Sequence, residues 1–430
     1  MATIPDHSEP VSGSGSWRRW VEPWYLAFAL QGMVIAGMLP ILIPLTVSQS
    51  GAVAEVGLVM AALNLGGLTS PVWGTLADRF RVHRILLIGG LIISAASLAA
   101  FAIAIHPGQW IVLALLAGLG AAGTATVANL FIVEIHAKAE WDERIGWLQT
   151  FYGVGQVGGL FLGGLFSQNA LKTGLIVSAG LCVVAALFGG LSPKPPKLAQ
   201  KIKPVLTHPA RMGDWAFLAP QRLFHHLDLS TIRKLGPALG SKFGLLLLIW
   251  LLAIGGSGAF FSQYPIIMQK VYGLAPPISS TAFAVVAGLG LALYSPSGIW
   301  SNKFGANRVM NLALIIRWLA YLLLFSIGFF SFGLKSVLAL IGLAFVVCAW
   351  SVISVSGTSL AAQLSRVGEG EGMGIFNAVN SLAGVLGAAL GGLVAVLWGY
   401  NFLTSMAVVG IGLGIILTLG LRVAIVKTGD

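Results

Sequence analysis

Uncharged polar side chains inside long apolar stretches are the residues of this sequence best suited to hold a ligand by hydrogen bonds. An amide or phenol with apolar neighbours needs a partner, which is either a bound molecule or another helix. Gln149, Tyr152 and Gln156 have the spacing of one helix face. Asn377 and Asn380 form a second such group. The other residues of this kind are Gln31, Asn64, Asn129, Gln263 and Tyr264.

The same apolar stretches lack the residues that catalysis or metal binding needs. No Asp, Glu or His falls near the middle of any of them, and no nucleophile stands with a base. Residues 153–158 match the dinucleotide pattern G-x-G-x-x-G, but no strand precedes them, and the sequence contains no P-loop. We therefore expect no enzyme activity, no cofactor, no metal and no direct use of ATP.

The composition requires a membrane environment. With 57% hydrophobic residues, 9% charged residues and a mean hydropathy of +0.90, the chain has too few polar groups to cover a soluble surface. Its apolar runs are continuous, whereas strands of a membrane barrel alternate. Nine of the 25 Lys and Arg lie in one stretch, residues 194–242, and most of the others lie in short turns on the same side of the spans, a placement that argues against nucleic acid. We expect helical spans in a lipid bilayer.

Twelve apolar stretches are long enough to cross a bilayer as helices. Under this assignment 21 of the 25 Lys and Arg lie on the side of both termini, and Lys172, Lys270 and Lys335 lie opposite. Basic residues favour the inner side of the membrane, so both termini are expected in the cytoplasm. The approximate spans are 25–48, 53–77, 85–105, 110–135, 145–166, 171–191, 243–268, 281–300, 310–332, 337–363, 373–397 and 402–424.

A charged turn, GTLADRFRVHR, separates the second and third spans at residues 74–84, and a weaker copy, GIWSNKFGANR, follows at residues 298–308. In the copy, Lys303 takes the place of Arg79, and Arg308 takes the place of Arg84. The first stretch resembles the loop motif G-x-L-a-D-r-x-G-r-r of the major facilitator superfamily, with Arg81 where a second glycine is usual. The matching residues are Gly74, Leu76, Asp78, Arg79 and Arg84.

The two halves of the chain also resemble one another outside the charged turns. At an offset of 228 residues, Gly159 and Gly163 correspond to Gly387 and Gly391. With Gly155, the first two glycines lie four residues apart on one helix face, a spacing that predicts close helix packing. The family resemblance then implies an all-α membrane protein with 12 transmembrane helices in two pseudo-symmetric six-helix bundles. Its substrate site would lie between the bundles near the midplane.

We expect five segments along the chain. These are a disordered cytoplasmic tail (1–24), the N-terminal bundle (25–191), a basic cytoplasmic linker (192–242), the C-terminal bundle (243–425) and a second tail (426–430). The linker carries nine of the 25 Lys and Arg against two Asp. It is either a solvated connection or holds a short helix on an anionic inner leaflet.

The resemblance assigns the charged turns a role in switching between conformations. In the family, the acid that matches Asp78 accepts hydrogen bonds from the amino end of the eleventh helix, where the helix dipole favours a carboxylate. A charge network around Arg79 would add Glu134 and the neighbours Glu143 and Arg144. The expected gate residues are Gly74, Asp78, Arg79, Arg84, Glu134, Glu143, Arg144, Lys303 and Arg308.

The family lines its cavity with the helices that carry the polar residues described above. Arg317 is the only basic residue well inside a span, which makes it a functional candidate by default. However, the family places the ninth helix outside the bundle, away from the cavity, so we favour a structural role. The expected substrate-binding residues are Gln31, Gln149, Tyr152, Gln156, Gln263, Tyr264, Asn377 and Asn380.

We expect a secondary transporter that moves a small organic molecule by alternating access. A mainly apolar cavity with amides and aromatic rings suits a neutral or amphipathic substrate. The fifth span is similar to the glycine motif of the family's drug and metabolite exporters, although Gln156 stands where that motif has proline. We expect a monomer in the cell membrane. The alternative is a transporter-fold membrane protein that acts as an assembly factor or sensor without transport.

Proton-coupled efflux is the family's usual mode for exported compounds, but the sequence offers few groups for it. Ala114 stands where the family's fourth helix often carries arginine. The acidic candidates, Glu55 and Glu134, lie near the ends of spans. If protons are partners, we expect Glu134 to carry them.

Overall fold

The computed structural model describes residues 20–49, 53–80, 82–136, 140–193, 241–331, 333–365 and 369–421. Within the helices, the side chains of Asp78, Arg79 and Glu134 are among those outside the description. Most of the expected linker and the second expected tail also lie outside the described residues. Every regular element in the described ranges is a helix.

The N-terminal half forms six membrane-length helices, of which the first two are interrupted. The first consists of α1 (Tyr25–Gly32), the π-helical turn η2 (Met33–Met38) and α2 (Leu39–Ser48). The second consists of α3 (Val53–Leu65), the 3-10 turn η3 (Gly66–Thr69) and α4 (Ser70–Phe80). The other four are α5 (His83–Ile103), α6 (Pro107–Ile135), α7 (Trp141–Phe166) and α8 (Leu171–Gly189).

The C-terminal half repeats this pattern. Its first helix is α11 (Lys242–Ser262), continued by α12 (Tyr264–Lys270) after a break at Gln263, whose φ of −124° is not helical. Pro265 follows the break and has no N–H to continue the helical hydrogen bonds. The other elements are α13 (Pro276–Phe304), α14 (Ala306–Gly328), α15 (Lys335–Leu364), α16 (Glu369–Leu397), the 3-10 turn η6 (Tyr400–Phe402) and α17 (Leu403–Thr418).

The two charged segments are mostly helical, so the expectation of compact turns is wrong. In the first, α4 continues to Phe80 and α5 begins at His83. In the copy, Gly305 alone separates α13 from α14, with φ of +89°. Only glycine adopts such a φ without strain, which explains how so short a connection reverses the chain. The helices are therefore longer than their apolar cores, and the charged residues lie on their ends.

Eleven helical segments of the described chain are long and apolar enough to cross a membrane. α7 is not among them, although it has 26 residues. Its polar residues and glycines lower its hydropathy, and it is covered by α1, η2 and α13, which pack against it. The expected twelve transmembrane helices therefore include one that depends on its neighbours for shielding from lipid.

Glycines bring equivalent helices into backbone contact in both halves. A Cβ at Gly155 or Gly159 of α7 would overlap backbone atoms of the first helix, at Met33 in the second case. A Cβ at Gly387 of α16 would likewise overlap the carbonyl of Gly255 on α11. The predicted close packing and the internal repeat are confirmed.

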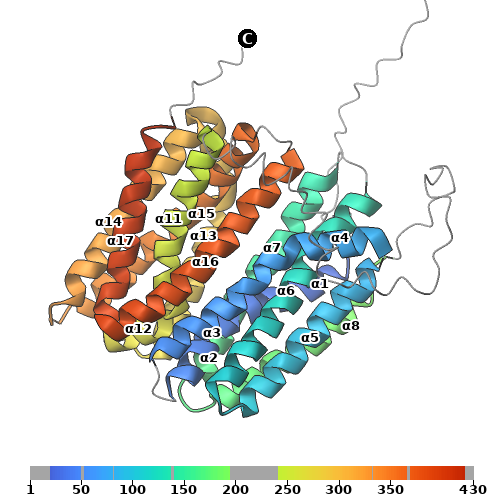
Figure 1. The fold of residues 1–430 in the computed structure, drawn as a ribbon, viewed down its shortest axis with the longest axis horizontal. Coiled ribbons are helices and arrows are strands. Elements are labelled where there is room, and N and C mark those ends of the chain that lie inside the picture. Colours follow the sequence, from blue (N-terminus) through green and yellow to red (C-terminus); the bar gives the residue numbers. More distant parts are fainter. Residues whose placement is uncertain are drawn as a thin grey trace, which may run out of the picture.

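Two six-helix bundles, α1–α8 and α11–α17, lie side by side (Figure 1). They contact each other through α3 against α16, α7 against α13 and α2 against α12. The backbones of Gly57 on α3 and Gly392 on α16 are in contact, since a Cβ added to Gly57 would lie 2.6 Å from the Cα atom of Gly392. A Cβ at Gly164, near the end of α7, would lie 3.1 Å from the Cβ of Ser280. These contacts belong to the end of the molecule that holds α2 and α12.

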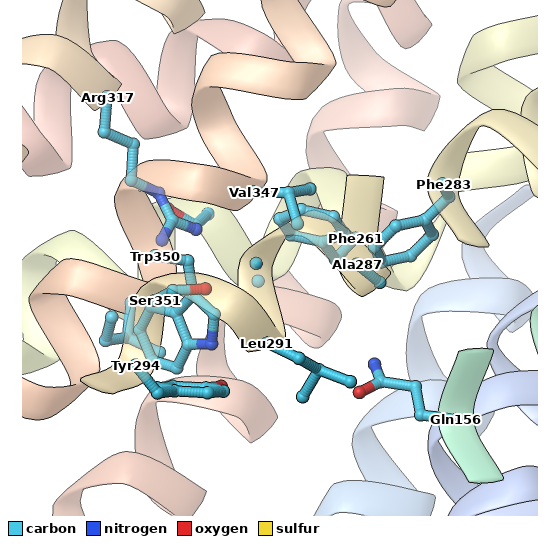
Figure 2. A pocket seen from close by; sticks show the side chains of 14 residues that line it. Gln156, Phe261, Phe283, Ala287, Leu291, Tyr294, Arg317, Val347, Trp350 and Ser351 are labelled. Atoms are coloured by element: carbon cyan, nitrogen blue, oxygen red, sulfur yellow. The ribbon is translucent and has the colours of Figure 1, made fainter. Parts of the chain in front are cut away.

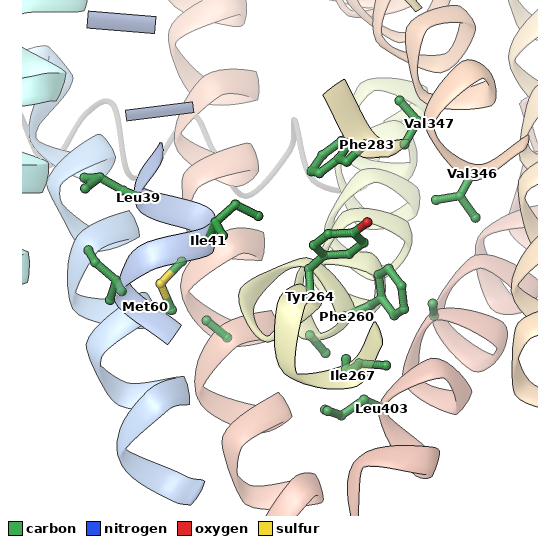
Figure 3. Packing of buried hydrophobic residues seen from close by; sticks show 14 of the residues in the cluster. Leu39, Ile41, Met60, Phe260, Tyr264, Ile267, Phe283, Val346, Val347 and Leu403 are labelled. Atoms are coloured by element: carbon green, nitrogen blue, oxygen red, sulfur yellow. The ribbon is translucent and has the colours of Figure 1, made fainter. Parts of the chain in front are cut away.

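A single hydrophobic cluster crosses from one bundle to the other at this end (Figure 3). It includes Leu39 and Ile41 of α2, Met60 of α3, and Tyr264 and Ile267 of α12. A second, smaller cluster belongs to the N-terminal bundle alone and centres on its first helix and α6. The first of these clusters, which we call the apolar seam, therefore joins the bundles mainly at one end.

Candidate functional site

A cavity of about 270 Å³ lies in the C-terminal bundle, beside its contact with α7 (Figure 2). Its walls come from α11, α13, α14 and α15, and Gln156 of α7 lines it from the other bundle. Because α7 and α13 belong to different bundles, a molecule bound here would contact both. Movement of one bundle against the other would change this site.

The cavity wall is mostly apolar and aromatic. Phe261, Phe283 and Trp350 supply flat surfaces, and Leu291 supplies aliphatic surface. An apolar pocket with a small number of convergent polar groups is typical of sites for small organic molecules. The polar side chains of the wall are Gln156, Ser257, Tyr294, Arg317 and Ser351.

Arg317 is the single charged residue among those that line the cavity. The residue is 3% exposed, and its guanidinium carbon lies 5.1 Å from the ring centroid of Trp350 and 5.8 Å from that of Tyr321. Its Nε and Nη1 atoms are buried and have no hydrogen-bond partner in the described part of the chain. Figure 2 shows the guanidinium beside Trp350 and Ser351. The expectation that Arg317 lies away from the cavity is wrong, because α14 packs against α13 and α15, which form the wall.

Three of the predicted substrate residues bond neighbouring helices. Gln31 is 2% exposed and donates from Nε2 to a backbone carbonyl of α6 at 2.8 Å. The hydroxyl of Tyr264 donates to the carbonyl of Ser279 at 2.7 Å. Oδ1 of Asn380 accepts from Nε1 of Trp250 at 3.0 Å. Each of these side chains therefore uses at least one polar atom to hold the bundle together.

Gln156 is the one predicted substrate residue that lines the described cavity. Gln149 and Asn377 are exposed, and Tyr152 is half-buried. Gln263 is fully buried at the break between α11 and α12, and neither atom of its amide has a partner in the described chain. The predicted set is therefore dispersed over both bundles.

The polar and aromatic wall residues that the sequence analysis missed include Tyr294, Trp350 and Ser351. Tyr294 lies on α13 and the other two on α15. These helices were not among those that we expected to carry the substrate residues. The sequence did contain a signal for these residues, because a cation buried at the position of Arg317 needs a neighbouring surface that can accommodate its charge.

The predicted gate residues are dispersed as well. Arg84 donates from Nη2 to the carbonyl of Gly190, which ties the start of α5 to the end of α8. Gly74 lies on α4, where a Cβ would come within 3.8 Å of Thr126 on α6. The exposed members are Glu143, Lys303 and Arg308. The side chains of Asp78, Arg79 and Glu134 lie outside the described part.

Arg144 forms an ion cluster with partners that the sequence did not identify. It is 8% exposed, and its Nε lies 3.0 Å from Oε2 of Glu140 while its Nη1 lies 3.1 Å from Oε1 of Glu22. Nε2 of His136 lies 2.8 Å from the same Glu22 oxygen. The cluster joins the segment before α1 to the connection between α6 and α7. Glu22 belongs to residues that we expected in the disordered tail, whereas the structure packs residues 20–24 onto the bundle, with Trp24 only 2% exposed.

Two like bundles of membrane-length helices, with an apolar cavity beside their contact, are the architecture of a membrane transporter. The chain belongs to the Major Facilitator Superfamily, whose family model matches residues 24–368. This finding confirms the resemblance carried by the charged segments at residues 74–84 and 298–308.

Three similar proteins give further detail. Multidrug resistance protein 2 of Bacillus subtilis (strain 168) is 22% identical over 398 residues, which cover 91% of this chain and 92% of that protein. The crystal structure of nucleoside transporter NupG has a TM-score of 0.68 at 14% identity, covering 94% of this chain and 99% of that one. The crystal structure of a D-xylose-proton symporter has a TM-score of 0.69 at 13% identity, covering 93% and 96%. The two structures share the fold.

Proposed function

We propose that this protein is a secondary transporter that exports a small amphipathic organic molecule from the cell by alternating access. The observation that carries the proposal is the cavity beside α7, whose wall combines aromatic rings with a few polar groups and includes residues of both bundles. Export is supported by the relative from Bacillus subtilis, which is named a multidrug resistance protein. We propose that it acts as a monomer in the cell membrane, with both termini and residues 192–242 in the cytoplasm.

The contacts between the bundles support a specific conformational state. They gather at the end that holds α2 and α12, through α3 against α16 and α2 against α12. If the termini are cytoplasmic, this end faces outward, and the structure corresponds to an inward-open state. Transport would then require these contacts to separate while the opposite ends, with α4, come together.

The transport test uses purified protein in liposomes. Compounds are first screened for stabilisation of the protein in detergent, and each compound that stabilises it is then loaded for flux measurement, with and without a pH gradient. Flux of a stabilising compound that depends on the protein supports the proposal. Stabilisation without flux of any such compound would instead support a sensor or assembly role, because binding would be retained without alternating access.

Proton coupling is a separate part of the proposal, because the described cavity wall contains no Asp, Glu or His. A proton carrier must then lie elsewhere, and Glu134 at the end of α6 is our candidate, with Glu55 of α3 as the second. We predict that Glu134→Gln abolishes any dependence of flux on the pH gradient while Glu55→Gln changes it less. A strong proton-driven flux that survives both substitutions would disprove this assignment.

A further inference from the structure

We infer that Arg317 forms an anion subsite in the cavity, which binds the carboxylate of an amphipathic organic acid while the apolar body of that acid lies on the aromatic wall. This inference rests on the proposed function for its biological role, and it narrows the substrate class to organic anions. The inference requires that no acidic residue of the protein neutralises the charge of Arg317.

The charge of Arg317 has no acidic counterpart on its own helix or on the three helices that pack against that helix. α14 packs on α13, α15 and α17, and none of these four helices contains an Asp or Glu. Between residues 242 and 421 the acidic residues are Glu369 and Glu371, at the start of α16. Arg317 lies eleven residues into α14, about 16 Å along the axis from its start. A buried cation at this depth is costly unless an anion accompanies it.

The aromatic neighbours of Arg317 leave N–H donors of its guanidinium without an acceptor. The rings of Trp350 and Tyr321 interact with the cation through their π faces, and such contacts use none of its N–H groups. Nε and Nη1 lack acceptors in the described part of the chain, so the group retains donors for a ligand. The planar fork of a guanidinium matches the two oxygens of a carboxylate, and Arg317 is among the residues that line the cavity.

The rest of the cavity wall suits the apolar body of an organic acid. Phe261, Phe283 and Leu291 offer an apolar surface away from the arginine, and Ser351 offers a hydroxyl close to it (Figure 2). A volume of about 270 Å³ suits a compact ring on a short chain. The occupant that satisfies both regions is an acid with a charged end and an apolar end, which is an amphipathic molecule.

The probe is tritiated 3-phenylpropionate, with equilibrium binding measured on the purified full-length protein in detergent. Unlabelled 3-phenylpropionate, its uncharged amide 3-phenylpropanamide and the lipid-like acid decanoate serve as competitors. We expect saturable binding that the two acids displace and that the amide displaces at least about tenfold less well, because the amide lacks the charge. Displacement by decanoate at far lower concentrations than by unlabelled 3-phenylpropionate would assign the site to a lipid-derived carboxylate, which is still the same anion chemistry.

The variants test the residue. Arg317→Gln should weaken binding of the probe about tenfold or more, Arg317→Lys should retain part of it, and Lys172→Gln, which removes an exposed cation from the other bundle, should change nothing. The comparison of acid with amide uses the wild-type protein, so it decides the question even if Arg317→Gln does not fold. Absence of saturable binding of the probe, equal competition by the amide, or unchanged affinity in Arg317→Gln would overturn the inference.

The outcomes also separate this inference from the proposed function. Binding that depends on Arg317, without flux of any stabilising compound in liposomes, would keep the anion subsite and remove the transport role. Flux of a neutral amphipathic compound together with no binding of either acid would keep transport and remove the subsite.

Discussion

Two arginines are almost fully buried in the described chain. Their surroundings differ, and the difference indicates a structural role for one and a ligand-binding role for the other. Arg144 meets carboxylates of Glu22 and Glu140, so its charge is neutralised within the protein. Arg317 lies against the rings of Trp350 and Tyr321, and its Nε and Nη1 atoms have no hydrogen-bond partner in the described chain beside the cavity. A paired buried arginine is expected to hold segments together, whereas an unpaired one beside a cavity is available to a ligand.

The paired arginine gives a prediction about stability. Arg144→Gln removes the charge that Glu22 and Glu140 share, and it leaves two carboxylates close together at side-chain exposures of 21% and 25%. We expect a loss of about 1–3 kcal/mol in stability, because partly buried charges are left uncompensated. Thermal unfolding in detergent measures this loss.

The matched control for this substitution is Lys172→Gln, which removes a basic residue that is exposed at the start of α8. Its unfolding temperature should stay within error of the wild type. If Arg144→Gln unfolds at the wild-type temperature, the ion cluster contributes nothing measurable and the fixed position of residues 20–24 has another cause.

At the scale of elements, the helix contacts depend on glycine where backbones touch. Gly159 of α7 faces Met33 in the π-helical turn, and Gly387 of α16 repeats the contact on α11. The π-helical turn has no counterpart at the same position of α11, where the chain instead breaks later, at Gln263. The two bundles are therefore built from the same glycine contacts but differ in how their first helices bend.

Gly159→Ala tests the closeness of this contact. An added methyl would overlap the Met33 carbonyl, so either α7 or the first helix must move. We expect a destabilisation of about 1–3 kcal/mol, measured by thermal unfolding. Gly180→Ala on α8 is the control, since a Cβ there meets nothing within 4 Å. Equal unfolding temperatures for the two variants would contradict the packing described here.

The fold was largely predictable from the sequence, and the site was not. Apolar runs defined the helices, and the first span, Tyr25–Ser48, was predicted with its observed bounds because both of its ends are polar. The charged segments were misjudged because helices continue past their apolar cores, to Phe80 and Phe304. Amides such as Gln31 were assigned to ligand binding, although a neighbouring helix supplies a partner. Only the packing of α14 against the cavity wall reveals the position of Arg317.

At the scale of the whole molecule, the two bundles meet through an apolar seam at one end and through α7 against α13 beside the cavity. Under the proposed alternating access, the bundles would rock about the cavity and expose it to each side in turn. At the seam the backbones of the two bundles approach each other closely, and the contacts are apolar. Separating the bundles there therefore breaks no buried ion pair among the described residues.

A disulfide across the seam tests whether it must open. A Cβ at Gly164 of α7 would lie 3.1 Å from the Cβ of Ser280 on α13, close to the separation of about 3.5–4.5 Å that a disulfide needs. We predict that Gly164→Cys with Ser280→Cys, made in a chain with Cys182→Ala and Cys348→Ala, forms a disulfide on oxidation and stops flux. Reduction should restore the flux.

The control pair is Gly391→Cys with Ala259→Cys, where a Cβ at the glycine would lie 3.0 Å from that of Ala259. Both of its positions belong to the C-terminal bundle, so that disulfide should leave flux intact. Flux that continues with the first disulfide fully formed would show that the seam does not open during transport.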